Sequence, residues 1–95
     1  MITSEMLIPL ELEWAPIQGL TPEARRLGNY LYELLMGGGR RERQEARELA
    51  LARPEGRAAL AHAIMRMRAV APGCGDSLRG QISRLCREAE AWTNT

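Results

Sequence analysis

The sequence predicts an all-α fold of three to four helices, with a C-terminal antiparallel helical hairpin and an extended N-terminal arm. Apolar residues recur at steps of three and four on both sides of a Pro-Gly-Cys-Gly turn at 72–75, and this spacing is typical of amphipathic helices. Glycine or proline marks the boundaries between the candidate helices. Alternation with a period of two is confined to the N-terminal residues. We therefore expect one domain, with an arm over 1–19 and a helical body over 20–95.

The arm is predicted from apolar and acidic residues that alternate between Pro9 and Pro16. They are Leu10, Glu11, Leu12, Glu13 and Trp14. The alternation favours an extended segment or short strand, although Thr3 or Ser4 is also suited to cap a single helical turn before Pro9. Because the sequence offers no second strand, three placements stay open: across its own helices, paired with a second copy, or added to a sheet edge of another protein.

Two helices are expected before the hairpin. The first covers 21–36, since Thr21 is a suitable N-cap, Pro22 suits the first helical position, and three glycines end the helix. The second covers about 40–52 and is rich in charge, with a thin apolar stripe. We interpret its charged side as a solvated face. The alternative is a contact site for anions or acidic protein surfaces, made of Arg40, Arg41, Arg43 and Arg47.

The hairpin is predicted from two amphipathic stretches joined by the short turn at 72–75, which makes them antiparallel neighbours. The first helix is expected from Pro54 to about Ala71, with Arg57 and Arg68 bordering its apolar face. Its opposite side is small and weakly polar, so we expect contacts on both faces. Its core face consists of Leu60, Ala63, Ile64, Met67, Val70 and Ala71. The second helix begins after a cap at Asp76 or Ser77, and its apolar stripe consists of Leu78, Ile82, Leu85, Ala89 and Trp92.

These helices offer more apolar surface than the chain itself is expected to cover, because the charged helix over 40–52 contributes little to a core. We therefore expect a protein partner, or a second copy in a homodimer, to bury the remainder. The candidate partner or dimer interface consists of Leu10, Leu12, Trp14, Met65, Leu78, Ile82, Leu85 and Trp92.

Residues for catalysis, cofactor binding or metal binding do not form a recognisable set in this sequence. His62 is the single histidine; it is expected at the surface or an interface, where Arg66 one turn later disfavours its protonation. Cys74 and Cys86 form neither a C-x-x-C pair nor a metal-ligand set. Cys74, in the glycine turn, is the candidate reactive thiol, and Cys86 is expected to be packed. The glycines at 37–39 lack the preceding strand and following Lys of a phosphate loop.

The charge distribution argues against several partners. Thirteen Arg, no Lys and twelve acidic residues give a net charge of +1, far from the basic balance of most nucleic-acid-binding domains. Residues 1–36 carry five Glu and two Arg, whereas 37–95 carry eleven Arg and seven acids. The absence of Lys and Phe is typical of a GC-rich bacterial or phage genome. With no basic leader and no membrane-length apolar run, we expect a cytoplasmic location, where thiols stay reduced.

One resemblance bears on function. Residues 11–20, Glu-Leu-Glu-Trp-Ala-Pro-Ile-Gln-Gly-Leu, lead into the capped helix over 21–36, and this arrangement resembles the start of the small helical quorum-sensing antiactivators. Those proteins bind LuxR-type transcription factors and stop them from dimerising or binding DNA. The triple glycine and the Arg-rich helix depart from that family. The resemblance implies helical dimerisation and a LuxR-type partner, and it carries over no binding residues.

The sequence thus predicts a small, non-catalytic regulatory protein that binds and inhibits or sequesters a partner protein. A LuxR-type factor is the candidate partner, and phage-encoded inhibition of a host protein would look the same. Two alternatives stay open: a nucleic-acid-associated protein that uses the Arg-rich helix over 40–53, and an accessory subunit or chaperone of a larger complex. Glutamates interleaved in that helix disfavour contact with DNA phosphates.

Overall fold

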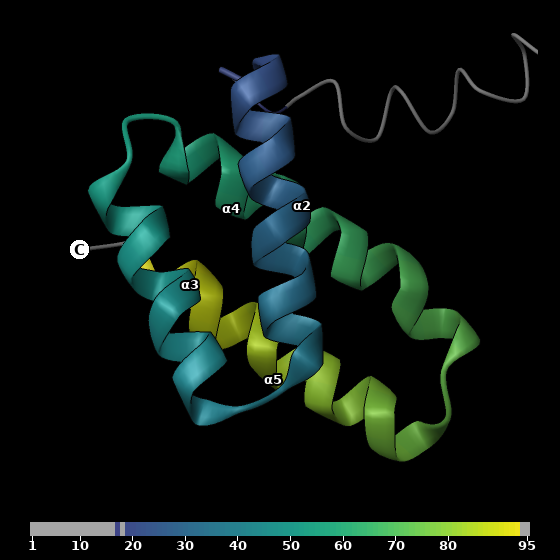
Figure 1. Cartoon of the computed structure of the whole chain (residues 1–95). Helices are drawn as coiled ribbons and strands as arrows, with labels where there is room; N and C mark the ends of the chain where they lie inside the picture. The colour runs from purple at the N-terminus through teal and green to yellow at the C-terminus, as the bar shows by residue number, and fades with distance from the viewer. Residues whose placement is uncertain (1–16, 18, 94–95) are drawn as a thin grey trace, which may run out of the picture.

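The fold is described from a computed structural model, which covers residue 17 and residues 19–93. Within that part, the regular elements are α2 (Pro22–Gly37), α3 (Arg40–Ala52), α4 (Gly56–Val70), the 3-10 turn η1 (Ala71–Gly73) and α5 (Asp76–Trp92), as Figure 1 shows. The predicted all-α class, with four helices and a C-terminal hairpin, is confirmed. The predicted arm lies outside the described residues, apart from Ile17 and Gly19.

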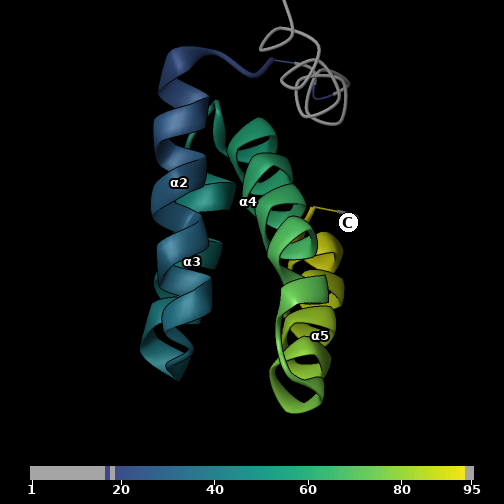
Figure 2. The ribbon, with the colours of Figure 1, turned by 90° about the vertical axis from the view of Figure 1, so that its right-hand side faces the viewer.

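The four helices form two antiparallel hairpins that pack as two layers. One layer consists of α2 and α3, and the other consists of α4 and α5 (Figure 2). α2 crosses α4 and makes its most extensive contact with that helix. The largest fully buried side chains come from both layers and meet between them. They are Leu31, Leu35, Leu60, Met67 and Ile82.

The bounds of α2 and α3 follow from local signals, as predicted. The Thr21 hydroxyl accepts a hydrogen bond from the Ala24 N–H at 3.1 Å, and Pro22 occupies the first helical position. At the other end Gly38 adopts a left-handed conformation with φ 84°, and its N–H donates to the Leu34 carbonyl. This conformation favours glycine because a Cβ would clash there.

The start of α4 differs from the prediction. Pro54 and Glu55 form a turn, and the helix begins at Gly56 instead of Pro54. Gly56 approaches the backbone of Ala50 so closely that a Cβ would overlap the Ala50 carbonyl. The prediction relied on the preference of proline for a first helical turn. The contact between the end of α3 and the start of α4 is tertiary, and it determines the start of α4 here in place of the proline preference.

The predicted cap of α5 is also wrong. Gly75 occupies the N-cap position without a side-chain hydrogen bond, and Asp76 is the first helical residue. The Asp76 carboxylate still lies in the first turn of α5, where it complements the positive end of the helix dipole. It also accepts a hydrogen bond from Arg79 at 2.9 Å.

α4 contacts other helices on both faces, as its small opposite side predicted. Its apolar face, with Leu60, Ile64 and Met67, forms part of the main core. On the other side Gly28 of α2 lies against α4: a Cβ at this position would be 2.8 Å from the Ala59 carbonyl oxygen and 2.8 Å from His62 Cδ2. The two helices therefore approach each other closely because residue 28 has no side chain.

Candidate protein-docking groove

The predicted partner residues are dispersed over the fold. Leu10, Leu12 and Trp14 lie outside the described residues. Ile82 is 1% exposed and belongs to the core, so it is not available to a partner. Leu78 is 43% exposed, at the start of α5.

The other three predicted residues, Met65, Leu85 and Trp92, are half-buried and line different hollows. Leu85 lines a largely polar hollow with Arg43 and Glu88. Trp92 borders a hollow with the exposed Leu51. Met65 lies in a groove of α4 and α5.

This groove runs along the outer face of the α4–α5 hairpin. We call it the hairpin groove, and it consists of two hollows that share Arg68. The groove side of α4 is opposite the side that packs on α2, since Ala61 and Met65 line the groove whereas Ala59 and His62 meet Gly28. The base of the groove consists of core residues that are almost fully buried, Leu60 and Ile64 in one hollow and Ile82 and Cys86 in the other. The apolar residues that a partner can reach are Ala61 and Met65 in the first hollow and Ala71 and Pro72 in the second.

Arginine side chains border this apolar floor. They are Arg57, Arg68, Arg79 and Arg87. Arg68 Nη2 lies 2.6 Å from Glu90 Oε2, and this ion pair connects α4 to α5 across the groove. Arg79 pairs with Asp76 within α5. Arg57 and Arg87 are exposed and form no ion pair with any part of the chain that the structure describes. The rim therefore carries two positive charges that are not matched by a neighbouring carboxylate.

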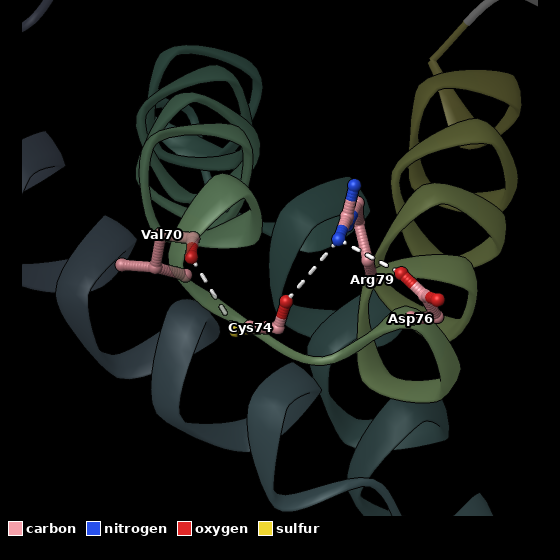
Figure 3. A network of polar contacts seen from close by, with 4 residues as sticks. All are labelled: Val70, Cys74, Asp76 and Arg79. Carbon is pink, nitrogen blue, oxygen red and sulfur yellow. Dashed lines mark hydrogen bonds and ion pairs between the residues drawn. The ribbon is translucent and has the colours of Figure 1, made fainter.

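The turn at one end of the groove is held by a small polar network (Figure 3). The Cys74 thiol donates to the Val70 carbonyl at 3.3 Å, and Arg79 of α5 donates to the Cys74 carbonyl at 3.5 Å. Cys74, the candidate reactive thiol, thus contributes to the connection between the two helices. Cys86, expected to be packed, is 3% exposed, and burial raises the pKa of its thiol despite the nearby Arg68.

The arginines of α3 do not share one environment. Arg40, Arg41 and Arg47 are exposed, whereas Arg43 donates to the Gly38 carbonyl at 3.2 Å and lies 3.8 Å from Glu88 of α5. Arg43 therefore holds elements of this chain together. Acidic residues stand beside the exposed arginines, and Glu45 accepts a 2.6 Å hydrogen bond from the Tyr30 hydroxyl. This bond to a carboxylate raises the pKa of Tyr30.

His62 is buried inside the chain, between α2 and α4, and not at the surface. It is 2% exposed, and its Nε2 lies 3.0 Å from the Asn29 amide oxygen. Arg66 Nη1 donates to the same oxygen at 2.9 Å. Because a guanidinium can only donate, Asn29 must present its oxygen here, and His62 Nε2 must carry the hydrogen. The Arg66 guanidinium also lies 4.0 Å from the centroid of the Tyr32 ring.

This environment favours the neutral form of His62. Burial is the largest cause that lowers the pKa of His62, and the positive charges of Arg66 and Arg25 lower it further. The direction expected from the Arg66 position is confirmed, although burial contributes more. The cluster of Asn29, His62, Arg66 and Tyr32 thus joins α2 to α4 by polar contacts.

Over residue 17 and residues 19–93, His, Cys, Asp and Glu side chains form no group of three or more that could hold a metal ion. The helices of this same part are all too short or too polar to cross a membrane. The chain matches no protein-family model, no curated protein and no solved structure. The class is therefore defined by the fold and the groove: a small two-layer α protein with an open, arginine-bordered groove on one hairpin.

Proposed function

We propose that this protein is a small, non-catalytic regulator that binds a partner protein through the hairpin groove and thereby inhibits or sequesters it. The observation that carries the proposal is the groove on the outer face of the α4–α5 layer, where four apolar residues are partly or fully exposed: Ala61, Met65, Ala71 and Pro72. α2 packs against the opposite side of α4, so the groove side is not covered by it. Open apolar grooves with polar borders are common sites for another chain to dock.

Within this class, we propose a LuxR-type transcription factor as the partner. The support is the resemblance of residues 11–36 to the start of the quorum-sensing antiactivators. The capped helix of that resemblance corresponds to α2, which begins after Thr21. Such a partner would place the encounter in the cytoplasm, and the helical dimerisation that the resemblance implies would use surfaces outside the groove.

The proposal is tested by co-expressing the full chain with LuxR-type regulators and a reporter promoter that each regulator activates. We expect the wild-type chain to lower reporter output and the Met65→Asp variant to lose this effect, because it places a charge in the apolar groove. Ala69→Asp is the matched control, since Ala69 is exposed on the same helix and lies outside the groove. If Met65→Asp and wild type inhibit equally, the groove is not the docking site.

Nucleic-acid binding is a second candidate, and the observation that favours it is the exposure of Arg40, Arg41 and Arg47 on α3. It predicts binding to duplex DNA that weakens steeply with salt, and loss of this binding in Arg47→Gln. If the protein is instead the proposed regulator, we expect little salt-dependent binding to DNA. Fluorescence anisotropy with a labelled duplex at low and high salt distinguishes the two.

A further inference from the structure

We infer that the hairpin groove takes an amphipathic helix of the partner whose apolar face is flanked by acidic residues. This inference rests on the proposed function, because it specifies the partner segment that the regulator would bind. It combines three properties of the groove: its length, its apolar lining and the charge of its border.

The first property is the direction and length of the groove, which favour a helix over an extended segment. The lining residues of α4 and η1 span Arg57 to Pro72, which at 1.5 Å per residue corresponds to roughly 22 Å, or about four turns of a bound helix. Both walls are helices, whose backbone groups are already paired within each helix. An extended strand would find no edge to pair with, whereas a helix satisfies its own backbone hydrogen bonds.

The second property is that the groove consists of two hollows, which meet at Arg68, the residue that lines both and pairs with Glu90. A docking helix would therefore place apolar side chains in each hollow, spaced by one or two turns along one face. Met65 suits this role because its unbranched, polarisable side chain adapts to the shape of different neighbours.

The third property is the positive border. Arg57 lies at one end of the groove on α4, and Arg87 borders the other hollow on α5. Both are exposed and can pair with carboxylates of a partner without breaking the Arg68–Glu90 or Arg79–Asp76 pairs. A second copy that docked through the same face would bring these arginines against each other, which disfavours a groove-to-groove dimer.

The test uses the full chain and three fluorescein-labelled peptides of about 15 residues. Each peptide is a stabilised helix with leucines along one face; the flanking positions are all Glu, all Gln or all Lys. We expect the Glu peptide to bind about tenfold more tightly than the Gln peptide, and the Lys peptide to bind most weakly. Raising the salt concentration should reduce the preference for Glu.

Three variants test whether the peptides bind in the hairpin groove. Met65→Asp should weaken the binding of all three peptides by about tenfold or more, and Ala69→Asp should bind them with the affinity of the wild type. Arg87→Gln, at an exposed position that should not affect folding, should weaken the Glu peptide and leave the Gln peptide unchanged. This double comparison isolates the contact between Arg87 and the carboxylates.

Several results would overturn the inference. Equal affinity for the three peptides would remove the charge preference, and unchanged binding by Met65→Asp would place the site elsewhere. Self-association that Met65→Asp abolishes would assign the groove to a second copy, and peptide binding only after deletion of residues 1–16 would assign it to the chain itself. Reporter inhibition that depends on Met65 but lacks peptide selectivity would leave the proposed function standing and reject only this partner chemistry.

Discussion

Gly28 determines how closely the two layers approach each other, because α2 crosses α4 at this residue. A Cβ here would lie 2.8 Å from both the Ala59 carbonyl oxygen and the His62 ring. Gly28→Ala should therefore destabilise the protein by about 1–3 kcal/mol through overpacking, as measured by urea denaturation.

Gly80→Ala provides the matched control for this prediction. Gly80 lies within α5, and a Cβ there would meet no atom within 4 Å. Alanine should stabilise the helix at this position by about 0.5–1 kcal/mol, because glycine has the higher conformational entropy in the unfolded chain. The two Gly→Ala substitutions should thus change the free energy of unfolding in opposite directions. Equal changes would contradict the close crossing of α2 and α4.

His62 should make stability depend on pH in one direction. Since burial, Arg66 and Arg25 lower the pKa of His62 from its ordinary 6.5, the unfolded chain takes up the proton first as the pH falls. The His62 contribution is constant above the unfolded pKa and decreases as the pH falls below it, until the folded pKa is reached.

The measurement for this prediction compares urea denaturation near neutral pH and at about pH 5.5, one unit below the unfolded pKa. The wild type should lose stability over this interval by more than His62→Gln, which removes the titrating group and keeps a donor toward Asn29. An identical pH dependence in the two proteins would show that His62 is not the responsible group.

At the scale of the element, α5 shows which part of an apolar stripe is core. Ile82 is 1% exposed, whereas Leu78, one turn earlier in the same stripe, is 43% exposed. Ile82→Ala should cost about 2–4 kcal/mol, because it removes buried methyl groups and leaves a cavity. Leu78→Ala should cost less than about 1 kcal/mol. Thermal and urea denaturation measure both, and similar costs would contradict the orientation of α5.

The sequence was sufficient to predict elements wherever the signal was local. Thr21 and Pro22 define the start of α2, and the glycines at 37–39 separate it from α3. The start of α4 was predicted two residues too early, since Gly56 is placed by its contact with Ala50 of another helix. In the same way, the burial of His62 depends on α2, which lies close against α4 at Gly28. Neither contact can be derived from residue spacing along one helix.

The candidate groove was predicted only in part. Met65 was expected at an interface and lines the groove with a half-buried side chain, whereas Ile82 was expected there and is buried at the base of the groove. Arg57 and Arg68 were visible in the sequence as borders of the α4 apolar face, and that position was the available signal for a charged rim. Arg87 gave no such signal, because only the packing of α5 on α4 brings it to the same groove.

At the scale of the whole molecule, one side of the α4–α5 hairpin is covered by the other layer and the opposite side is open. α2 and α3 cover one side of the α4–α5 hairpin and complete the core with Leu31 and Leu35. The other side of the hairpin carries the groove and four of the thirteen arginines. The open side of the molecule therefore has a positive border, on which Arg68 and Arg79 are paired with carboxylates and Arg57 and Arg87 are exposed.

The same division leads to a prediction about residues 1–16. The buried apolar residues of the described part all lie between Ala24 and Ala89 and belong to the four helices. Deletion of residues 1–16 should therefore leave the helical circular dichroism per molecule nearly unchanged and should preserve cooperative unfolding. Inhibition in the reporter assay should weaken, because Leu10, Leu12 and Trp14 of the arm belong to the predicted partner interface.

A full-length variant with Glu5, Glu11 and Glu13 replaced by Gln is the control, since it removes the arm's negative charge and keeps its length and apolar residues. If this variant behaves like the deletion, charge is the property that the partner recognises in the arm; if it behaves like wild type, the apolar residues are responsible. If the four helices form the core by themselves, the deletion leaves helicity intact. A deletion that abolished helicity would instead show that the arm completes the core.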